Sequence, residues 1–300
     1  MNRFIFVTIL FFGVGISVQA QDLKVESERD RDNNISLICD NSTSGVYTLL
    51  IDVPRHDNLK PNSSLPAVKT VQRGRTKVLE LDRINPNQSD GLQYSYRYYK
   101  GFIKSKLEDV TYSLPFPDRS LARGVEFSHL KEYLNTGEKP DGFYAVGFFF
   151  EEETPVLASR KGLVIEVTDD QIVTKKNLIY SRVKNSVEIL HDDGTFTIIS
   201  VMKPGSIKVE PGQEVNVGDV LGLSGGENYD SGYHIRLLTQ RLVRKNREEL
   251  AYENIVMKFL DANQGAVKIS SGNTYEATFP EELITAEMSK RDYKRWLKTQ

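Results

Sequence analysis

The residues that could do metal or acid–base chemistry are few in this chain. Its 300 residues include four histidines and one cysteine. Three of the histidines lie in recognisable short motifs, His129 in FSHL, His191 in HDDG and His234 in GYHIR. Imidazole can ligate a metal or move a proton near neutral pH, so these motifs are the first candidates for a site. The lone Cys39 excludes an intramolecular disulfide and a cysteine-rich zinc module.

Composition limits the kind of protein that could carry these motifs. Hydrophobic residues make up 39% and charged residues 27%, as in soluble globular proteins. The 39 basic and 41 acidic side chains give a net charge of −2, so nothing points to nucleic acid as a partner. The length allows one large domain or two ordinary ones.

The first twenty residues have the pattern of a cleaved signal peptide. Arg3 precedes an apolar run, and Val18-Gln19-Ala20 places small residues where signal peptidase cuts. The alternative is a membrane anchor, for which the apolar run is short. We therefore expect a periplasmic or secreted protein with no membrane span once residues 1–20 are removed.

Short strand-like runs predict a small β-sandwich-like domain over residues 21–120. They are separated by Asn, Asp, Pro and Gly clusters and lie at 34–39, 46–53, 76–82 and 92–101. In the last run Tyr94, Tyr96 and Tyr98 alternate with polar residues, the period of a half-buried strand. We favour packing on a sandwich over a sugar-stacking platform for this row.

A second β-rich domain is expected over residues 125–245, after a proline-containing linker. Its predicted strands lie at 163–167, 186–190, 195–202, 219–223 and 233–239, and Asp193-Gly194 is a strong hairpin signal. Residues 246–300 should add strands near 254–261 and 266–270. They end in a helix over 280–300, whose acidic residues come early and basic residues late.

An ordered series of turns in the second domain resembles the LytM/lysostaphin-type zinc endopeptidases of bacterial cell walls. The series comprises TPV (154–156), the Gly162 turn, HDDG (191–194), PGQ (211–213), VGD (217–219) and GYH (232–234). The resemblance implies a mainly β fold: an N-terminal β-sandwich-like domain, a LytM/lysostaphin-type antiparallel β domain and a C-terminal helix.

Set on the family's pattern, this sequence lacks most of the metal site. The family holds zinc with a His, an Asp and the second His of an H-x-H strand, and two further histidines handle the water and the oxyanion. The resemblance places His129 at the first ligand, Gly147 at the Asp, and Arg236 at the second His of H-x-H. His234 keeps the first His of that element, and Val201 takes the other catalytic histidine's place. His191 matches a position that is not a ligand.

These departures predict a pseudoenzyme with no metal cofactor. Catalytic zinc takes three protein ligands and an open position, and an arginine offers no lone pair. The alternative is an active zinc-dependent peptidoglycan endopeptidase whose ligands are replaced by Glu151–Glu153 or Asp230. A biotinyl/lipoyl-like carrier is a third reading of residues 209–222, but Lys203 is followed directly by Pro204.

We therefore expect a non-catalytic protein of the cell envelope that binds peptidoglycan peptides or regulates a cell-wall enzyme. The binding residues we expect are Arg236, His234 and Tyr144. On a strand, residues two apart share a face, so His234 and Arg236 should both point into the former metal groove. A guanidinium there would suit a carboxylate, either of an external ligand or of an internal acid such as Asp230.

Overall fold

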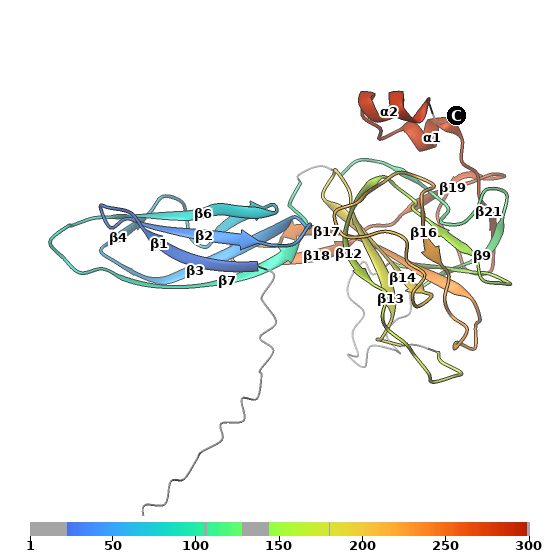
Figure 1. The fold of residues 1–300 in the computed structure, drawn as a ribbon, viewed down its shortest axis with the longest axis horizontal. Helices are drawn as coiled ribbons and strands as arrows, with labels where there is room; N and C mark the ends of the chain where they lie inside the picture. Colours follow the sequence, from blue (N-terminus) through green and yellow to red (C-terminus); the bar gives the residue numbers. More distant parts are fainter. Residues whose placement is uncertain (1–22, 105–106, 128–143, 180, 299–300) are drawn as a thin grey trace, which may run out of the picture.

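Two β-rich units lie side by side along the long axis of the molecule, and two short helices end the chain (Figure 1). The computed structural model describes residues 23–104, 107–127, 144–179 and 181–298. The mainly β architecture with a helical C-terminus is confirmed.

The N-terminal unit is a sandwich of two antiparallel sheets with the strand orders β1-β2-β6-β4 and β5-β3-β7. Its strands are β1 (Leu23–Arg29), β2 (Ile35–Asn41), β3 (Tyr47–Asp57), β4 (Leu59–Pro61), β5 (Ala67–Val71), β6 (Gly74–Arg83) and β7 (Gly91–Lys100). Alternate side chains of both sheets enter one core, in which Leu37, Leu49 and Leu81 are fully buried. Burial of these apolar side chains is the main driving force that holds the two sheets together.

The tyrosine row on β7 lies partly inside this sandwich. Tyr94 and Tyr96 pack against the core, and the Tyr94 hydroxyl donates to the Val25 carbonyl at 3.1 Å. The Tyr96 hydroxyl accepts from the Val25 amide at 3.4 Å. Tyr98 is 46% exposed and meets Tyr47 edge to face. The packing interpretation therefore accounts for Tyr94 and Tyr96.

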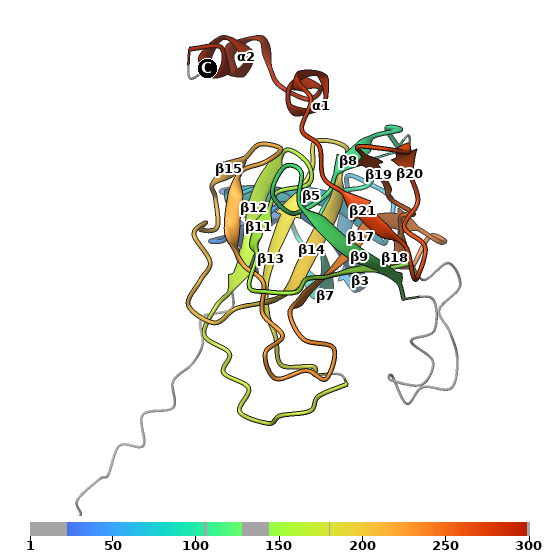
Figure 2. The same cartoon turned by 90° about the vertical axis from the view of Figure 1, so that its right-hand side faces the viewer.

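The second unit is built on a large antiparallel sheet with the order β15-β12-β13-β14-β17-β10-β9-β21, and β18 pairs with β17 (Figure 2). These strands are β9 (Leu121–Glu126), β10 (Val146–Phe149), β12 (Gly162–Thr168), β13 (Asn185–Leu190), β14 (Thr195–Met202), β15 (Glu214–Val215), β17 (His234–Arg244), β18 (Leu250–Asn254) and β21 (Thr274–Glu276). Smaller sheets pair β11 (Pro155–Leu157) with β16 (Val220–Leu223), and join β8 (Thr111–Ser113), β19 (Lys258–Asp261) and β20 (Gly265–Val267). The main sheet thus takes in strands from both sides of the range 125–245.

The hairpin predicted at Asp193-Gly194 is confirmed. It joins β13 and β14, which pair antiparallel. Gly194 has a φ of +81°, and a Cβ atom there would lie 2.7 Å from the Phe102 carbonyl oxygen. The turn therefore needs glycine both for its left-handed backbone and for the close approach of the preceding segment.

The C-terminal helix expected over 280–300 is two short helices, α1 (Glu281–Thr285) and α2 (Lys290–Trp296). Ser289 interrupts the helical run, because its hydroxyl accepts from the Asp292 amide and so caps a new N-terminus. Between the helices, Glu287 forms a bidentate ion pair with Arg160, whose Nη1 also donates to Asp193 at 3.0 Å. Arg160 is only 2% exposed, so this cluster fixes the helices to the sheet domain.

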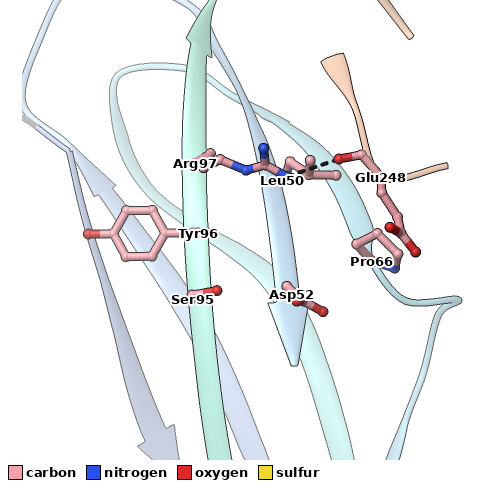
Figure 3. Close-up of a pocket in the computed structure, with 7 residues that line it drawn as sticks. All are labelled: Leu50, Asp52, Pro66, Ser95, Tyr96, Arg97 and Glu248. Carbon is pink, nitrogen blue, oxygen red and sulfur yellow. Dashed lines mark hydrogen bonds between the residues drawn. The ribbon is translucent and has the colours of Figure 1, made fainter. Parts of the chain in front are cut away.

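The two units meet through β3, β7 and the strands β17 and β18. Leu50 packs with Leu242 and Leu250, while the Lys100 ammonium lies 2.8 Å from Glu188. Figure 3 shows the pocket beside this contact, in which Arg97 of β7 donates to the Glu248 carbonyl oxygen at 2.9 Å. Apolar and charged contacts therefore both join the sandwich to the second unit.

Among the described residues, no helix is long and apolar enough to cross a membrane.

Candidate functional site

Among the described residues, three positions that the sequence analysis assigned to the metal and catalytic site lie on neighbouring strands. Gly147 of β10 and Arg236 of β17 are register partners, and Phe149 pairs with His234 two residues away. On the other side of β17, Ser200 of β14 pairs with Arg236 and precedes Val201. The strand register therefore brings Gly147, Arg236 and Val201 to one place on the sheet.

The space beside Gly147 is filled by an aromatic ring. A Cβ atom at Gly147 would lie 2.6 Å from Cε2 and 2.9 Å from Cζ of Phe127. Real Cβ atoms do not approach so closely, so an aspartate side chain could enter only if the Phe127 ring moved. At this position the chain offers no donor atom, and the ring takes up the room that one would need.

The Arg236 side chain lies between two aromatic rings. Its guanidinium carbon is 5.3 Å from the centroid of Phe127 and 5.3 Å from that of Tyr229, within the range of cation–π attraction. Its Nη2 donates to the Ile179 carbonyl at 3.5 Å. Desolvation and then the Arg236 charge lower the pKa of Lys184 nearby. The side chain at this ligand position is thus a guanidinium cation fixed by its neighbours, and its charge repels a metal ion.

His234 is fully buried and held neutral. Its Nδ1–H donates to the Gly232 carbonyl at 2.8 Å, while its ring stacks on Phe149 with centroids 4.9 Å apart. Burial, followed by the positive charge of Arg236, lowers the pKa of His234 to about 4. The unprotonated Nε2 is buried, and no group in the described part of the chain forms a hydrogen bond with it. At neutral pH the Nε2 of this imidazole therefore carries a lone pair. The single N–H proton of the ring is already donated to the Gly232 carbonyl.

Val201 is the inserted residue of a β-bulge. Asn185 pairs with Met202 and Ser186 with Ser200, so Val201 lies between two successive pairs. Its φ is +67°, a left-handed conformation that costs a β-branched residue about 1–3 kcal/mol. Its carbonyl accepts from the Gly225 amide at 2.8 Å. The strained backbone is fixed by this contact, and the valine side chain has nothing with which to carry a proton.

The comparisons with known proteins bear on this same stretch of chain. Residues 143–248 match peptidase family M23. We refer to the unit that contains this segment as the M23 domain, after the family model that the segment matches. None of the curated proteins matches the chain.

Several solved structures resemble the chain over the M23 domain or beyond it. One chain of the SpoIIQ–SpoIIIAH pore-forming complex is 19% identical to this one. The match covers 48% of this chain and 89% of that chain, with a TM-score of 0.32. The catalytic domain of lysostaphin from Staphylococcus simulans is 19% identical, covers 43% and 79%, and has a TM-score of 0.26. Csd3 from Helicobacter pylori is 12% identical, covers 92% and 84%, and has a TM-score of 0.29.

Three candidate residues remain: His129, His191 and Tyr144. His129 lies outside the described residues. His191 is 2% exposed and bonds on both sides, to the Lys161 carbonyl at 2.7 Å and the Thr197 hydroxyl at 2.8 Å. Tyr144 is 5% exposed and belongs to the hydrophobic core of the domain. A role for Tyr144 in binding therefore stays a prediction.

The acidic residues named as replacement ligands do not gather around His234. Glu151, Glu152 and Asp230 are exposed, and Glu153 forms an ion pair with Lys203. Among the residues that the structure describes, no group of three His, Cys, Asp or Glu side chains is placed to hold a metal ion. The described part of the former site does not suit zinc, which takes three such ligands at a catalytic centre.

Two aromatic residues of the site, Phe127 and Tyr229, were missed by the sequence analysis. Phe127 belongs to the motif FSHL, in which only the histidine has a side chain that could ligate a metal. Its role depends on the missing side chain of Gly147, a relation across β9 and β10 that no spacing within one segment reveals. The glycine itself could have indicated such a ring. A position without a side chain leaves a void in a packed domain unless a neighbouring side chain fills it.

Proposed function

We propose that the protein is a non-catalytic binding protein of the cell envelope, whose M23 domain uses the former metal groove to hold a ligand. The observation that carries this proposal is the replacement of ligand chemistry at one place on the sheet. Where the family's pattern needs two metal ligands, Gly147 and Arg236 stand, and the Phe127 ring packs on both. We infer that the strands around these positions can still bind a peptide although they hold no metal.

The chemistry of the groove favours an anionic ligand. Arg236 presents a planar fork of donors, and Lys184 adds a second positive charge close by. The rings of Phe127 and Tyr229 hold the guanidinium in place, so little side-chain entropy is lost when an anion binds. The ligand we propose is a carboxylate, either the end of a peptidoglycan stem peptide or an acidic side chain of a cell-wall enzyme.

Removal of the guanidinium tests this proposal. A charge-assisted hydrogen bond contributes about 1.5–3 kcal/mol, so Arg236→Ala should weaken the binding of stem peptides about ten-fold or more. The melting temperature should change little, since cation–π contacts at such a site contribute about 0.5–1 kcal/mol. The matched control is Arg97→Ala, which removes an arginine of the sandwich whose side chain donates to the Glu248 carbonyl across the junction in Figure 3.

A ligand change makes the experiment sharper. A stem peptide with an amidated C-terminus should bind the wild-type chain as weakly as the free acid binds Arg236→Ala. The loss of affinity from amidation and the loss from Arg236→Ala should not add when the two changes are combined. Unchanged binding of the free acid by Arg236→Ala, together with a clear loss of thermal stability, would show that Arg236 serves the fold.

A further inference from the structure

A large groove lies between the M23 domain and the C-terminal helices, far from the former metal groove. Its volume is about 870 Å³, in the range of sites that take ligands or peptide side chains. Figure 2 shows α1 and α2 at one end of the main sheet, while the segment between β12 and β13, beside Arg236, lies at the other end. The groove is therefore a separate surface, and its role does not depend on the proposed function.

The floor and the helical wall of the groove are apolar. Val220 of β16 is 41% exposed at its floor, and the Phe279 ring packs over the Gly218 turn beside it. Ile284, Met288 and Trp296 line the wall from the helical segment, and each remains partly exposed. Neither helix buries any of its residues fully.

Such helices are too short to be stable alone. Isolated helices below about 12 residues are marginal in water, and packing normally supplies the missing stability. Here the anchor is polar: Arg160 holds Glu287, and the Lys161 ammonium donates to the Glu287 carbonyl at 3.2 Å. The ion pairs fix the helices above the sheet domain and leave the apolar side chains facing an open groove.

The rim of the groove carries negative charge. Asp118, Glu214 and Asp219 are exposed along it, on the sheet-domain side. Two arginines accompany the carboxylates: Arg295 lies 3.9 Å from Asp292 on its own helix, and Arg119 lies 3.7 Å from its neighbour Asp118. An apolar floor with an acidic rim is complementary to a segment that carries both apolar and basic side chains.

We propose that this groove binds a peptide segment of a partner protein in which apolar and basic residues alternate. In an extended segment, successive side chains point to opposite sides. One set would fill the space between Val220 and Trp296, and the other would reach the carboxylates of the rim. Binding would complete the packing that α1 and α2 lack.

The chain contains a built-in reporter for this surface, because Trp296 is its only tryptophan. We would titrate the purified chain with a short capped peptide of alternating leucine and lysine and follow tryptophan emission. The expected result is a saturable blue shift as water leaves the indole ring. A peptide of alternating leucine and glutamate, and one of alternating serine and lysine, should each bind at least about ten-fold more weakly.

Two sets of variants locate the binding. The pair Glu214→Gln and Asp118→Asn should weaken the leucine–lysine peptide about five-fold, as expected for two exposed charges. The matched control pair, Asp32→Asn and Asp82→Asn, removes two exposed acids from the sandwich and should leave the affinity unchanged. Val220→Ser, which alters an exposed position and should not disturb the fold, should also weaken binding.

Several results would overturn the proposal. These are an unchanged emission spectrum at saturating leucine–lysine peptide, equal binding of the leucine–glutamate peptide, and equal affinity of the rim variants and wild type. A blue shift that grows with protein concentration in the absence of peptide would show that a second copy of the chain fills the groove, and would equally overturn it.

Discussion

Acidification should destabilise the protein through the buried imidazole of His234. The folded state holds the pKa of His234 at about 4, because burial and the Arg236 charge oppose protonation. In the unfolded chain histidine takes up its proton near pH 6.5. Between these values the unfolded state binds more protons, so the free energy of unfolding falls as the pH falls.

The magnitude follows from the size of that window. The decrease in the free energy of unfolding due to His234 is negligible well above pH 6.5. It is about 2 kcal/mol at pH 5 and approaches about 3.4 kcal/mol well below pH 4. The buried His191 has its pKa lowered as well, first by burial and then by the Arg160 charge, so it adds a loss of the same sign. The sum is a large part of the stability of an ordinary domain.

The assay is urea unfolding at pH 7 and pH 5, followed by circular dichroism, for wild type and His234→Phe. Phenylalanine keeps a ring stacked on Phe149 but cannot titrate, so the variant should lose about 2 kcal/mol less than wild type between the two pH values. The lost bond to Gly232 lowers its stability at both pH values and cancels in this comparison. His56→Asn removes an exposed imidazole of the sandwich and serves as the matched control. If wild type and His234→Phe differ by less than about 0.5 kcal/mol in this pH response, the reasoning about His234 is wrong.

Two further predictions concern the polar cluster and the lost ligands. Glu287→Ala should lower the free energy of unfolding by about 2–3 kcal/mol, because it breaks a largely buried ion pair while Asp193 still holds Arg160. Urea unfolding measures the loss, and protease cleavage near α1 should become faster; a change below about 0.5 kcal/mol would contradict the assigned role. The pair Gly147→Asp and Arg236→His should bind zinc more tightly than wild type in a calorimetric titration but hydrolyse little, since Val201 supplies no proton carrier. Adding Phe127→Ala should tighten zinc binding further by freeing the space at Gly147, and a folded triple variant that binds no more zinc than wild type would show that these positions are not the ligand positions.

The strands of the fold could be predicted from the sequence because their signals are local. The alternation in β7, the apolar runs of β13 and β14, and the Asp193-Gly194 turn each depend on neighbouring residues. The break between α1 and α2 was missed, because acidic and basic residues follow the helix dipole across both helices and Ser289 alone marks the new start.

The site could be predicted only in part. Gly147 and Arg236 were assigned to the site from the resemblance to cell-wall peptidases, and in the structure they are register partners on β10 and β17. The Phe127 ring over Gly147 and the pairing of Arg160 with Glu287 join residues on separate elements. Such contacts form only when the elements of the sheet domain pack together, so the sequence pattern of one segment does not predict them.

Elemental analysis of the purified chain decides whether the M23 domain lacks catalytic zinc. We expect that residues 21–300 carry no stoichiometric zinc and do not clear cell-wall suspensions, because Gly147 and Arg236 offer no ligand atoms. The contradicting result is nearly one zinc per chain by elemental analysis, together with cleavage of cross-linked peptidoglycan that a chelator stops.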